Sequence, residues 1–142
     1  MSDLDAGEPN LFEYLSQHAQ VRAMIQDRVY HQRIPQHVFD KGGNIMDCAV
    51  YQRTGGRPDV TFCESGGLVA GQYQVDSYSP DDVRFVQLAR AIRKALVDYS
   101  GPMGAVTVKK VFLETDFDTP EPEPGLYRRT QTYTIWYAEA EG

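Results

Sequence analysis

The sequence has few of the features that mark whole classes of protein. Only two of its 142 residues are cysteine, Cys48 and Cys63, which is too few for a disulfide framework. No apolar run approaches the roughly 20 residues that a membrane-spanning helix needs. The acidic start of the chain lacks the basic and apolar regions of a signal peptide. These absences predict a soluble, intracellular protein without a membrane partner, whose two thiols stay reduced and pack as small core residues.

A surplus of basic residues is also missing. The chain carries 14 Lys and Arg against 20 Asp and Glu, a net charge of −6. Proteins that hold nucleic acid through its phosphates usually show a basic surplus, so the balance argues against nucleic acid as the main partner. Apolar residues make up 42% and charged residues 24%, which predicts one packed globular domain over residues 1–142.

No constellation of catalytic residues is evident. The sequence contains no nucleophile elbow, no glycine loop for phosphate and no HExxH motif. The carboxylate pair Asp81-Asp82 is explained by a helix start, and the pair Asp116 and Asp118 by a solvated loop. A thiol nucleophile formed by either cysteine and a histidine stays open as an alternative. We therefore expect a protein that is not an enzyme and has no catalytic or cofactor-binding residues.

The potential metal ligands are also sparse. His18, His31 and His37 are the only histidines, and none stands at a ligand spacing from another or from the two cysteines. We expect no metal site and no cofactor.

Charge is distributed very unevenly along the chain. Residues 1–13 carry four acids and no base, residues 114–125 carry five acids and no base, and the last four residues add two acids. The rest of the chain has a net charge of +5. A basic body with acidic appendages suggests contacts between copies or with a partner, although acidic ends also serve solubility alone.

Two helices are predicted. Residues 10–26 follow the helical period, with Asn10 as the N-cap and Glu13 at the third helical position. Residues 80–98 form a longer amphipathic helix with Ser79 as its N-cap, and Leu88, Ile92 and Leu96 lie on its apolar stripe. The other side of this helix carries four basic residues: Arg84, Arg90, Arg93 and Lys94.

Four strands are predicted from alternating and β-branched residues over residues 44–53, 68–78, 105–114 and 126–137. A short segment at 60–64 would make a fifth strand. The fold class is therefore α+β: an antiparallel sheet of about four or five strands with two helices on one face, in the order α-β-β-α-β-β.

The last strand carries large apolar residues on both of its sides. Tyr133 and Ile135 share one side, while Leu126 and Trp136 share the other. One layer of helices covers only one face of a sheet, so this pattern hints that the second face meets another molecule.

Two further segments stand apart from this predicted body. Residues 1–9 form an acidic N-terminal tail. Residues 116–125 contain three alternating prolines and form an acidic hairpin arm that resists pairing in the sheet.

Four segments in order resemble the tail-completion or tail-terminator family of tailed bacteriophages and related prophage or gene-transfer particles. They are DRVYHQRIPQ at 27–36, VYQRTGG at 50–56, YQVDSYSPDDVRFVQLARAIRKAL at 73–96 and GLYRRTQTYTIWY at 125–137. The resemblance spans residues 10–138, with one departure, VFDKGGN at 38–44, where a proline-rich segment is expected.

The resemblance implies a structural virion protein in the tail or neck, assembled in the host cytoplasm. Such proteins form a six-membered homo-oligomeric ring on the tail tube, stop its growth and present the surface that joins the head. The implied partners are other copies of the chain, the tail tube protein and a head-side connector or head-closure protein. DNA would pass through without specific binding, which suits an acidic protein.

The alternatives are another connector or tube component on the same fold, or a small intracellular enzyme or ligand-binding module. If the chain is a tail-completion or tail-terminator protein, we expect the acidic arm to dock on a neighbouring subunit or on the head-side connector. Within such an interface the predicted residues are Asp116, Asp118, Glu121 and Glu123 of the arm, and Arg84, Arg90, Arg93, Lys94, Arg128 and Arg129 as their basic receptors.

Overall fold

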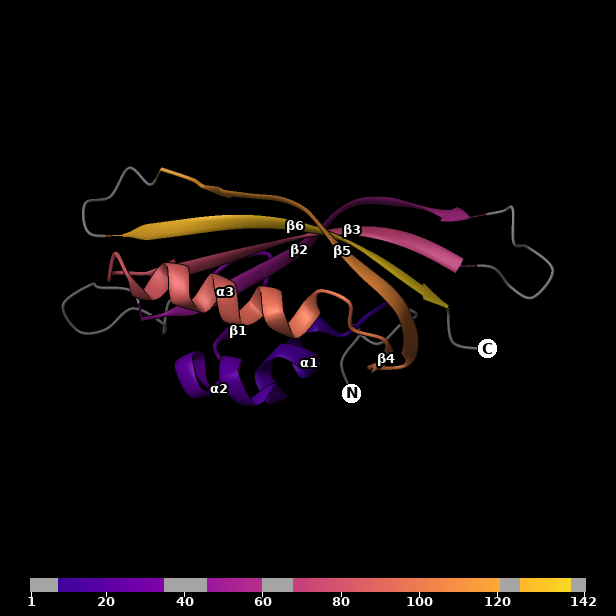
Figure 1. Ribbon diagram of the computed structural model, residues 1–142, viewed down its shortest axis with the longest axis horizontal. Helices are drawn as coiled ribbons and strands as arrows, with labels where there is room; N and C mark the ends of the chain where they lie inside the picture. Colours follow the sequence, from indigo (N-terminus) through magenta and orange to yellow (C-terminus); the bar gives the residue numbers. More distant parts are fainter. Residues whose placement is uncertain (1–7, 35–45, 60–67, 121–125, 139–142) are drawn as a thin grey trace.

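The computed structural model describes residues 8–34, 46–59, 68–120 and 126–138 of the chain. It is an α+β fold of three helices and a six-stranded sheet (Figure 1). The helices are α1 (Leu11–Gln17), α2 (Ala19–Ile25) and α3 (Arg84–Leu96). The strands are β1 (Val29–His31), β2 (Cys48–Asp59), β3 (Leu68–Ser79), β4 (Gly101–Met103), β5 (Val106–Asp118) and β6 (Tyr127–Ala138).

The sheet has the strand order β1-β2-β3-β6-β5-β4. Every neighbouring pair is antiparallel except β1 and β2, which run parallel, so the sheet is mixed and the predicted purely antiparallel sheet is wrong at this edge. Four long strands match the predicted ones. The two three-residue edge strands β1 and β4 were not predicted, because segments so short carry no alternation to detect.

Two of the long strands extend beyond their predicted ends. The first long strand was predicted to end at Arg53, but β2 continues to Asp59 through a register shift between Arg53 and Gly55. β5 reaches Asp118 instead of ending at Glu114, so Asp116 and Asp118 pair with β6 within the sheet. The expectation that these two residues project from the sheet is therefore wrong. The predicted strand at 60–64 lies outside the described residues.

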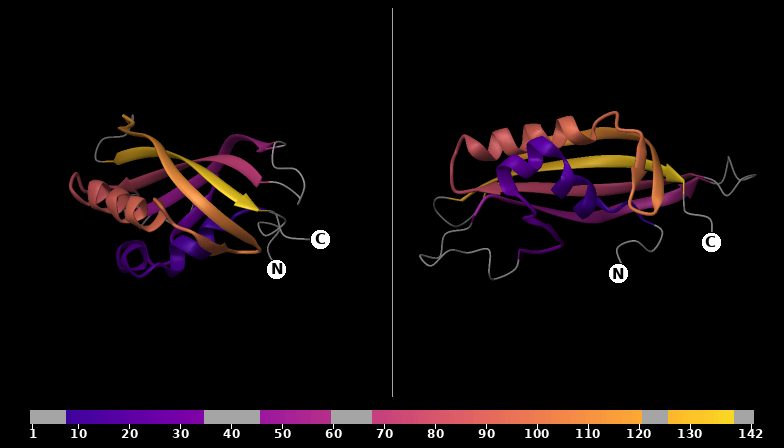
Figure 2. Two further views of the ribbon diagram at one scale, coloured as in Figure 1. Left: turned by 45° about the vertical axis from the view of Figure 1, so that its right-hand side comes forward. Right: turned by 90° about the horizontal axis from the view of Figure 1, so that it is seen from below.

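The three helices lie together on one side of the sheet, with α3 along its length (Figures 1 and 2). The expected face is buried: Leu88, Ile92 and Leu96 of α3 have no exposed surface, which confirms that prediction. They pack against side chains of the central strands such as Tyr133 and Ile135, which are also fully buried.

The predicted first helix is two helices. The backbone of His18 is extended (φ −72°, ψ 126°) and separates α1 from α2. Leu15 before the break and Val21 after it are both buried, so both short helices contribute to the core. The Asn10 side chain accepts a hydrogen bond from the Glu13 amide at 3.0 Å, as expected for an N-cap.

Helix α3 begins at Arg84, four residues later than predicted. Ser79 does not cap the helix; its hydroxyl donates to Asp47 at 2.6 Å and accepts from the Asp81 amide at 3.1 Å. The Asp81 carboxylate instead accepts the amide protons of Val83 and Arg84, at 2.7 and 3.1 Å. The serine therefore fixes a turn, and the aspartate satisfies the first free amides of the helix.

A second, smaller apolar cluster lies on the sheet face opposite the helices. Cys48 is fully buried there against Tyr30, Ile34, Tyr78 and Leu126. The chain thus covers part of its own second face, including Leu126, one of the two residues that suggested a partner. Within the part of the chain that the structure describes, no helix is long and apolar enough to cross a membrane.

Candidate assembly surfaces

The acids at the base of the predicted arm face a partner within the same chain. The Arg129 guanidinium lies 2.7 Å from the Asp118 carboxylate and 3.7 Å from that of Asp116. Asp118 of β5 is paired with Arg129 of β6, and Asp116 lies two residues earlier on the same, helix side of the sheet. The two carboxylates raise the pKa of Arg129 above its ordinary value, the hydrogen bond to Asp118 being the largest cause. Among the described residues, Arg129 is the predicted receptor that forms ion pairs with acids of the arm. Glu121 and Glu123 lie outside the described residues.

Arg128 has a different environment on the opposite face of the sheet. Its Nε lies 3.3 Å from the Asp76 carboxylate, and its guanidinium lies 5.5 Å from the ring centroid of Tyr78. Asp76 is only 4% exposed and also accepts hydrogen bonds from Thr130 at 2.6 Å and Gln74 at 2.9 Å. Arg128 is therefore a structural ion-pair residue, and its buried aspartate is satisfied from three sides.

The predicted basic residues of α3 divide into two groups. Arg84 forms an ion pair with Asp47 at 2.5 Å, so it links the helix to the start of β2. Arg90, Arg93 and Lys94 are exposed. Among the described residues none of these three forms an ion pair, and we call them the basic helix face.

Sequence reasoning missed an exposed set of side chains on β5. Phe112 is 46% exposed and Phe117 is 51% exposed, and they flank the exposed Thr115. Two residues five positions apart in a regular strand point to opposite faces. Here the register shifts between Leu113 and Thr115, because Glu114 is an extra, bulged residue.

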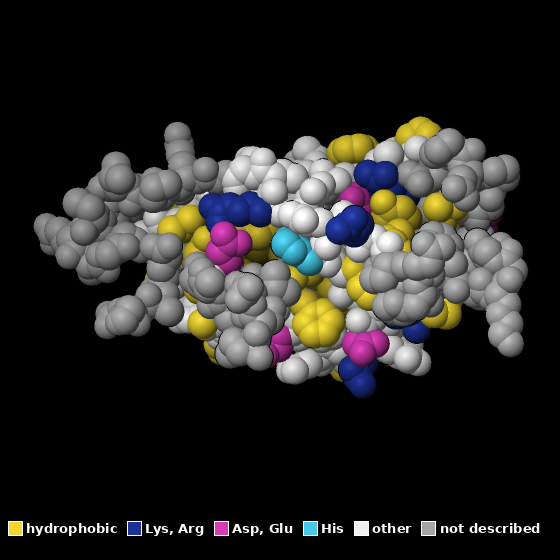
Figure 3. Space-filling model, turned by 180° about the vertical axis from the view of Figure 1, so that it is seen from behind, with side chains coloured by type: hydrophobic (Ala, Val, Ile, Leu, Met, Phe, Trp, Pro, Cys, Tyr) yellow, Lys and Arg dark blue, Asp and Glu magenta, His cyan; other side chains and the backbone are white. Residues whose placement is uncertain are grey.

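The bulge brings both phenylalanines to one face. Phe112 pairs with Thr134 and Phe117 with Thr130, and these threonines share the face of the sheet opposite the helices. We call Phe112, Thr115 and Phe117 the aromatic strip. Figure 3 views the side of the molecule away from α3, where hydrophobic side chains lie along the upper margin beside uncharged polar ones.

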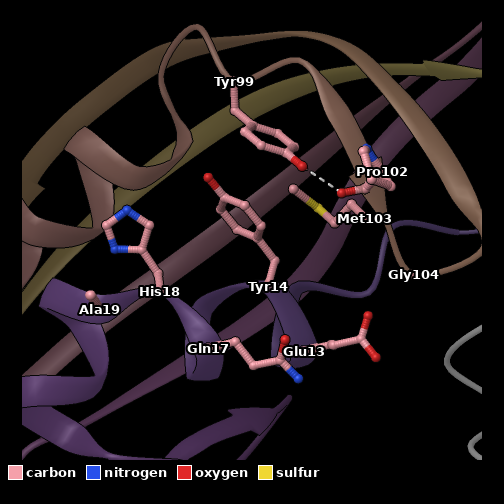
Figure 4. Close-up of a pocket in the computed structure, with 9 residues that line it drawn as sticks. All are labelled: Glu13, Tyr14, Gln17, His18, Ala19, Tyr99, Pro102, Met103 and Gly104. Carbon is pink, nitrogen blue, oxygen red and sulfur yellow. Dashed lines mark hydrogen bonds between the residues drawn. The ribbon is translucent and has the colours of Figure 1, made fainter.

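A hollow of about 660 Å³ lies where α1 and α2 meet the segment after α3 (Figure 4). The rings of Tyr14 and Tyr99 contact each other there with centroids 4.4 Å apart. The Tyr14 hydroxyl donates to the Ala95 carbonyl, and the Tyr99 hydroxyl donates to the Pro102 carbonyl at 2.6 Å. Burial raises the pKa of Tyr14 to about 12, so its hydroxyl stays protonated at neutral pH. Both hydroxyls thus hold backbone segments together and are occupied as donors.

The family model for tail completion protein gp17 matches residues 9–138, nearly the whole described fold. The chain belongs to the tail completion protein gp17 family. This confirms the resemblance drawn from the four sequence segments. Membership identifies the chain as a structural protein of a phage-type tail.

The fold of this family member also matches a solved structure. A chain from the virion of a native gene transfer agent particle superposes with a TM-score of 0.60 at 14% sequence identity, covering 98% of this chain and 95% of that one. At this identity the likeness shows a shared fold. No curated protein matches the sequence.

Proposed function

We propose that this tail completion protein forms a six-membered ring on the end of the tail tube, stops tube growth and provides the surface that joins the head. The observation that carries the proposal is the family match over residues 9–138, which includes all three helices and all six strands. The chain's partners would then be other copies of itself, the tail tube protein and a head-side connector.

The surfaces of the described residues support assembly with other proteins. The aromatic strip exposes two large apolar side chains on the side that the helices leave open. The basic helix face presents three cations without ion pairs among the described residues. Exposed aromatic residues and arginines are the types enriched in protein interfaces.

The acidic hairpin contributes a second, electrostatic contact in this proposal. Because Arg129 already binds Asp116 and Asp118, the acids left for a partner are Glu121 and Glu123. Their receptors would be the basic helix face of a neighbouring copy or the head-side connector. Contacts of this exposed kind stabilise weakly and are screened by salt.

The decisive experiment is electron cryomicroscopy of complete particles and of tails that lack this protein. We expect one ring of six copies between tube and head in complete particles. Without the protein, tubes should have uncontrolled length and fail to join heads.

Two results would contradict the proposal. Density for this chain repeated along the tube would make it a tube component, and a single copy in the neck would exclude the ring. Because some rings form only on a tube end, a monomer in dilute solution is compatible with the proposal.

A further inference from the structure

The far end of β5 has little support apart from its pairing with β6. β4 pairs with β5 only as far as Val108, so within the described chain the outer edge of β5 faces no other strand beyond that residue. Every residue from Glu114 to Asp118 is exposed, so this length of strand adds no side chain to the buried core. A strand held mainly by one neighbour twists and frays easily. The direction of this end therefore depends on a few side-chain contacts.

The strand also bends at the root of this end. Glu114 is the extra residue at the register shift, and a bulge bends its strand and increases its twist. On the face opposite the helices, hydroxyl groups hold β5 to β6 beyond the bulge. Thr115 is hydrogen-bonded to Thr132, and Thr119 is hydrogen-bonded to Thr130 at 2.6 Å. These contacts join β5 only to its neighbouring strand.

On the helix side, Arg129 connects the end of β5 to a helix. Its Nε donates a hydrogen bond to the Asp118 carboxylate at 2.7 Å, and its guanidinium lies 5.8 Å from the ring centroid of Phe85 in the first turn of α3. Phe85 is only 7% exposed, and the ring of Tyr127 stacks on it with the centroids 5.4 Å apart. The arginine thus ties an exposed strand end to a ring that is anchored in the core.

The chemistry of the arginine side chain suits this connection. A guanidinium is planar, so its edge binds carboxylates in a defined geometry while its face contacts an aromatic ring. The Asp116 carboxylate, 3.7 Å from the Arg129 Nε, adds a second attraction from the same strand. The cluster restrains the direction of β5 as well as its distance from α3. Exposed ion pairs add little to global stability, so the effect is local.

The described ends of the connection between β5 and β6 are held as well. The Thr119 amide donates to the Arg128 carbonyl at 2.9 Å, and Leu126 packs against the buried Cys48. Residues 121–125 therefore join two restrained points. A segment whose ends are restrained before docking loses less conformational entropy on binding.

We propose that Arg129 is the positioning residue of this hairpin. It holds the end of β5 against the first turn of α3, and so presents the connection to a partner in the direction that docking requires. The inference rests on the proposed function, in which Glu121 and Glu123 contact a partner. Arg129 acts on docking through Asp116 and Asp118, not by touching the partner.

The first test measures the hairpin in the purified protein. Arg129→Gln should accelerate amide hydrogen exchange in residues 114–119 by up to about fivefold, the scale of one exposed ion pair. Exchange in α3 and the melting temperature should hardly change. The matched control is Lys110→Gln, which removes the exposed ion pair with Asp98 from the same strand and should leave exchange in 114–119 unchanged.

The second test separates positioning from direct contact with the partner. Asp116→Asn combined with Asp118→Asn removes the carboxylates that bind Arg129 but keeps the arginine. This variant and Arg129→Gln should reduce the joining of heads to tails, counted by electron microscopy, by similar factors. Combining all three substitutions should reduce joining no further, because residues that act as one unit are not additive.

Three results would overturn the inference and leave the proposed ring standing. Unchanged exchange in residues 114–119 of both variants would show that Arg129 does not hold β5. Faster exchange with normal joining would show that docking does not depend on the direction of the hairpin. Loss of joining in Arg129→Gln but not in the aspartate variant would assign Arg129 to direct contact with the partner.

Failure of the proposed docking has a different signature. Normal joining after removal of residues 121–125 would contradict the role of this connection in the proposed function, and with it the role of Arg129 in joining. The exchange measurement would still report whether Arg129 holds the strand.

Discussion

At the scale of single residues, burial separates the side chains that hold this fold from those that are free to bind. Ile92 and Leu96 on α3 are fully buried, whereas Arg90 and Lys94 on the same helix are exposed. Asp76 is a buried charge, but three neighbouring groups satisfy it, so it belongs to the structure and not to a site of chemistry. Substitutions at these positions should therefore divide cleanly between loss of stability and loss of assembly.

Ile92→Ala should lower the free energy of unfolding by about 2–5 kcal/mol, because it leaves a cavity between α3 and the sheet. Urea unfolding of the purified protein measures this loss. Gln87→Ala, at an exposed position five residues earlier on the same helix, is the matched control and should change stability by no more than about 0.5 kcal/mol. Equal, small effects of both substitutions would mean that α3 does not face the core at Ile92.

Cys48 should be unreactive in the folded protein. Burial raises the pKa of its thiol from 9.0 to about 12, so almost no thiolate forms at pH 8. Iodoacetamide at pH 8 should label Cys48 only after unfolding, as followed by mass spectrometry.

The raised pKa also means that the folded state disfavours the thiolate. The stability that the buried, protonated Cys48 thiol contributes is present below pH 9 and is lost as pH rises toward 12. Cys48→Ala should weaken this alkaline loss of stability.

At the scale of the elements, short side-chain contacts decide where helices and strands begin and end. Sequence signals located α3, but a serine-aspartate turn delays its start to Arg84. The strand predicted over 44–53 ends at Arg53, yet pairing with β3 carries β2 to Asp59. The bulge at Glu114 determines that Phe112 and Phe117 share a face, which the sequence period alone assigns wrongly.

Asp81→Ala should lower the melting temperature, since the amides of Val83 and Arg84 lose their acceptor. Those two hydrogen bonds hold the pKa of Asp81 below its ordinary value. The stabilisation is therefore present above the ordinary aspartate pKa and is lost as pH falls through the lowered one. The difference in melting temperature between wild type and variant should shrink with acid. Asp82→Ala is the matched control, and an equal effect of both substitutions would contradict the capping role of Asp81.

At the scale of the whole molecule, the sheet divides the protein into two unlike sides. The helices, the buried core and the basic helix face lie on one side, and the aromatic strip lies on the other. A small second cluster around Cys48 covers only part of that other side. In the ring that we propose, neighbouring copies would meet through two unlike surfaces.

Replacing residues 121–125 with Asn-Gly should leave the protein folded, because β5 and β6 remain paired up to Asp118 and Arg129. Circular dichroism and thermal melting should resemble those of the wild type, while the joining of heads to tails or the control of tail length should fail. The variant Glu121→Gln with Glu123→Gln keeps the length of the connection and removes its charge. Normal tails and full infectivity in the shortened variant would show that the connection only solubilises the protein.

The sequence by itself determined the broad class of this protein. Helical periodicity and alternation in the long segments identified α3 and the four long strands, because side-chain period directly reflects which face is buried. Four ordered segments also indicated the tail completion family, which the match over residues 9–138 confirms. The pairing of the acids near the hairpin with Arg129 was among the alternatives that the sequence left open.

Tertiary structure decided the features that depend on neighbours far along the chain. The break at His18 leaves no signal in the helical period of residues 10–26, and the short strands β1 and β4 exist only through pairing with longer ones. The common face of Phe112 and Phe117 depends on one extra residue opposite β6. A period read along one strand contains no information about its partner's register, so the aromatic strip became visible only when the sheet was assembled.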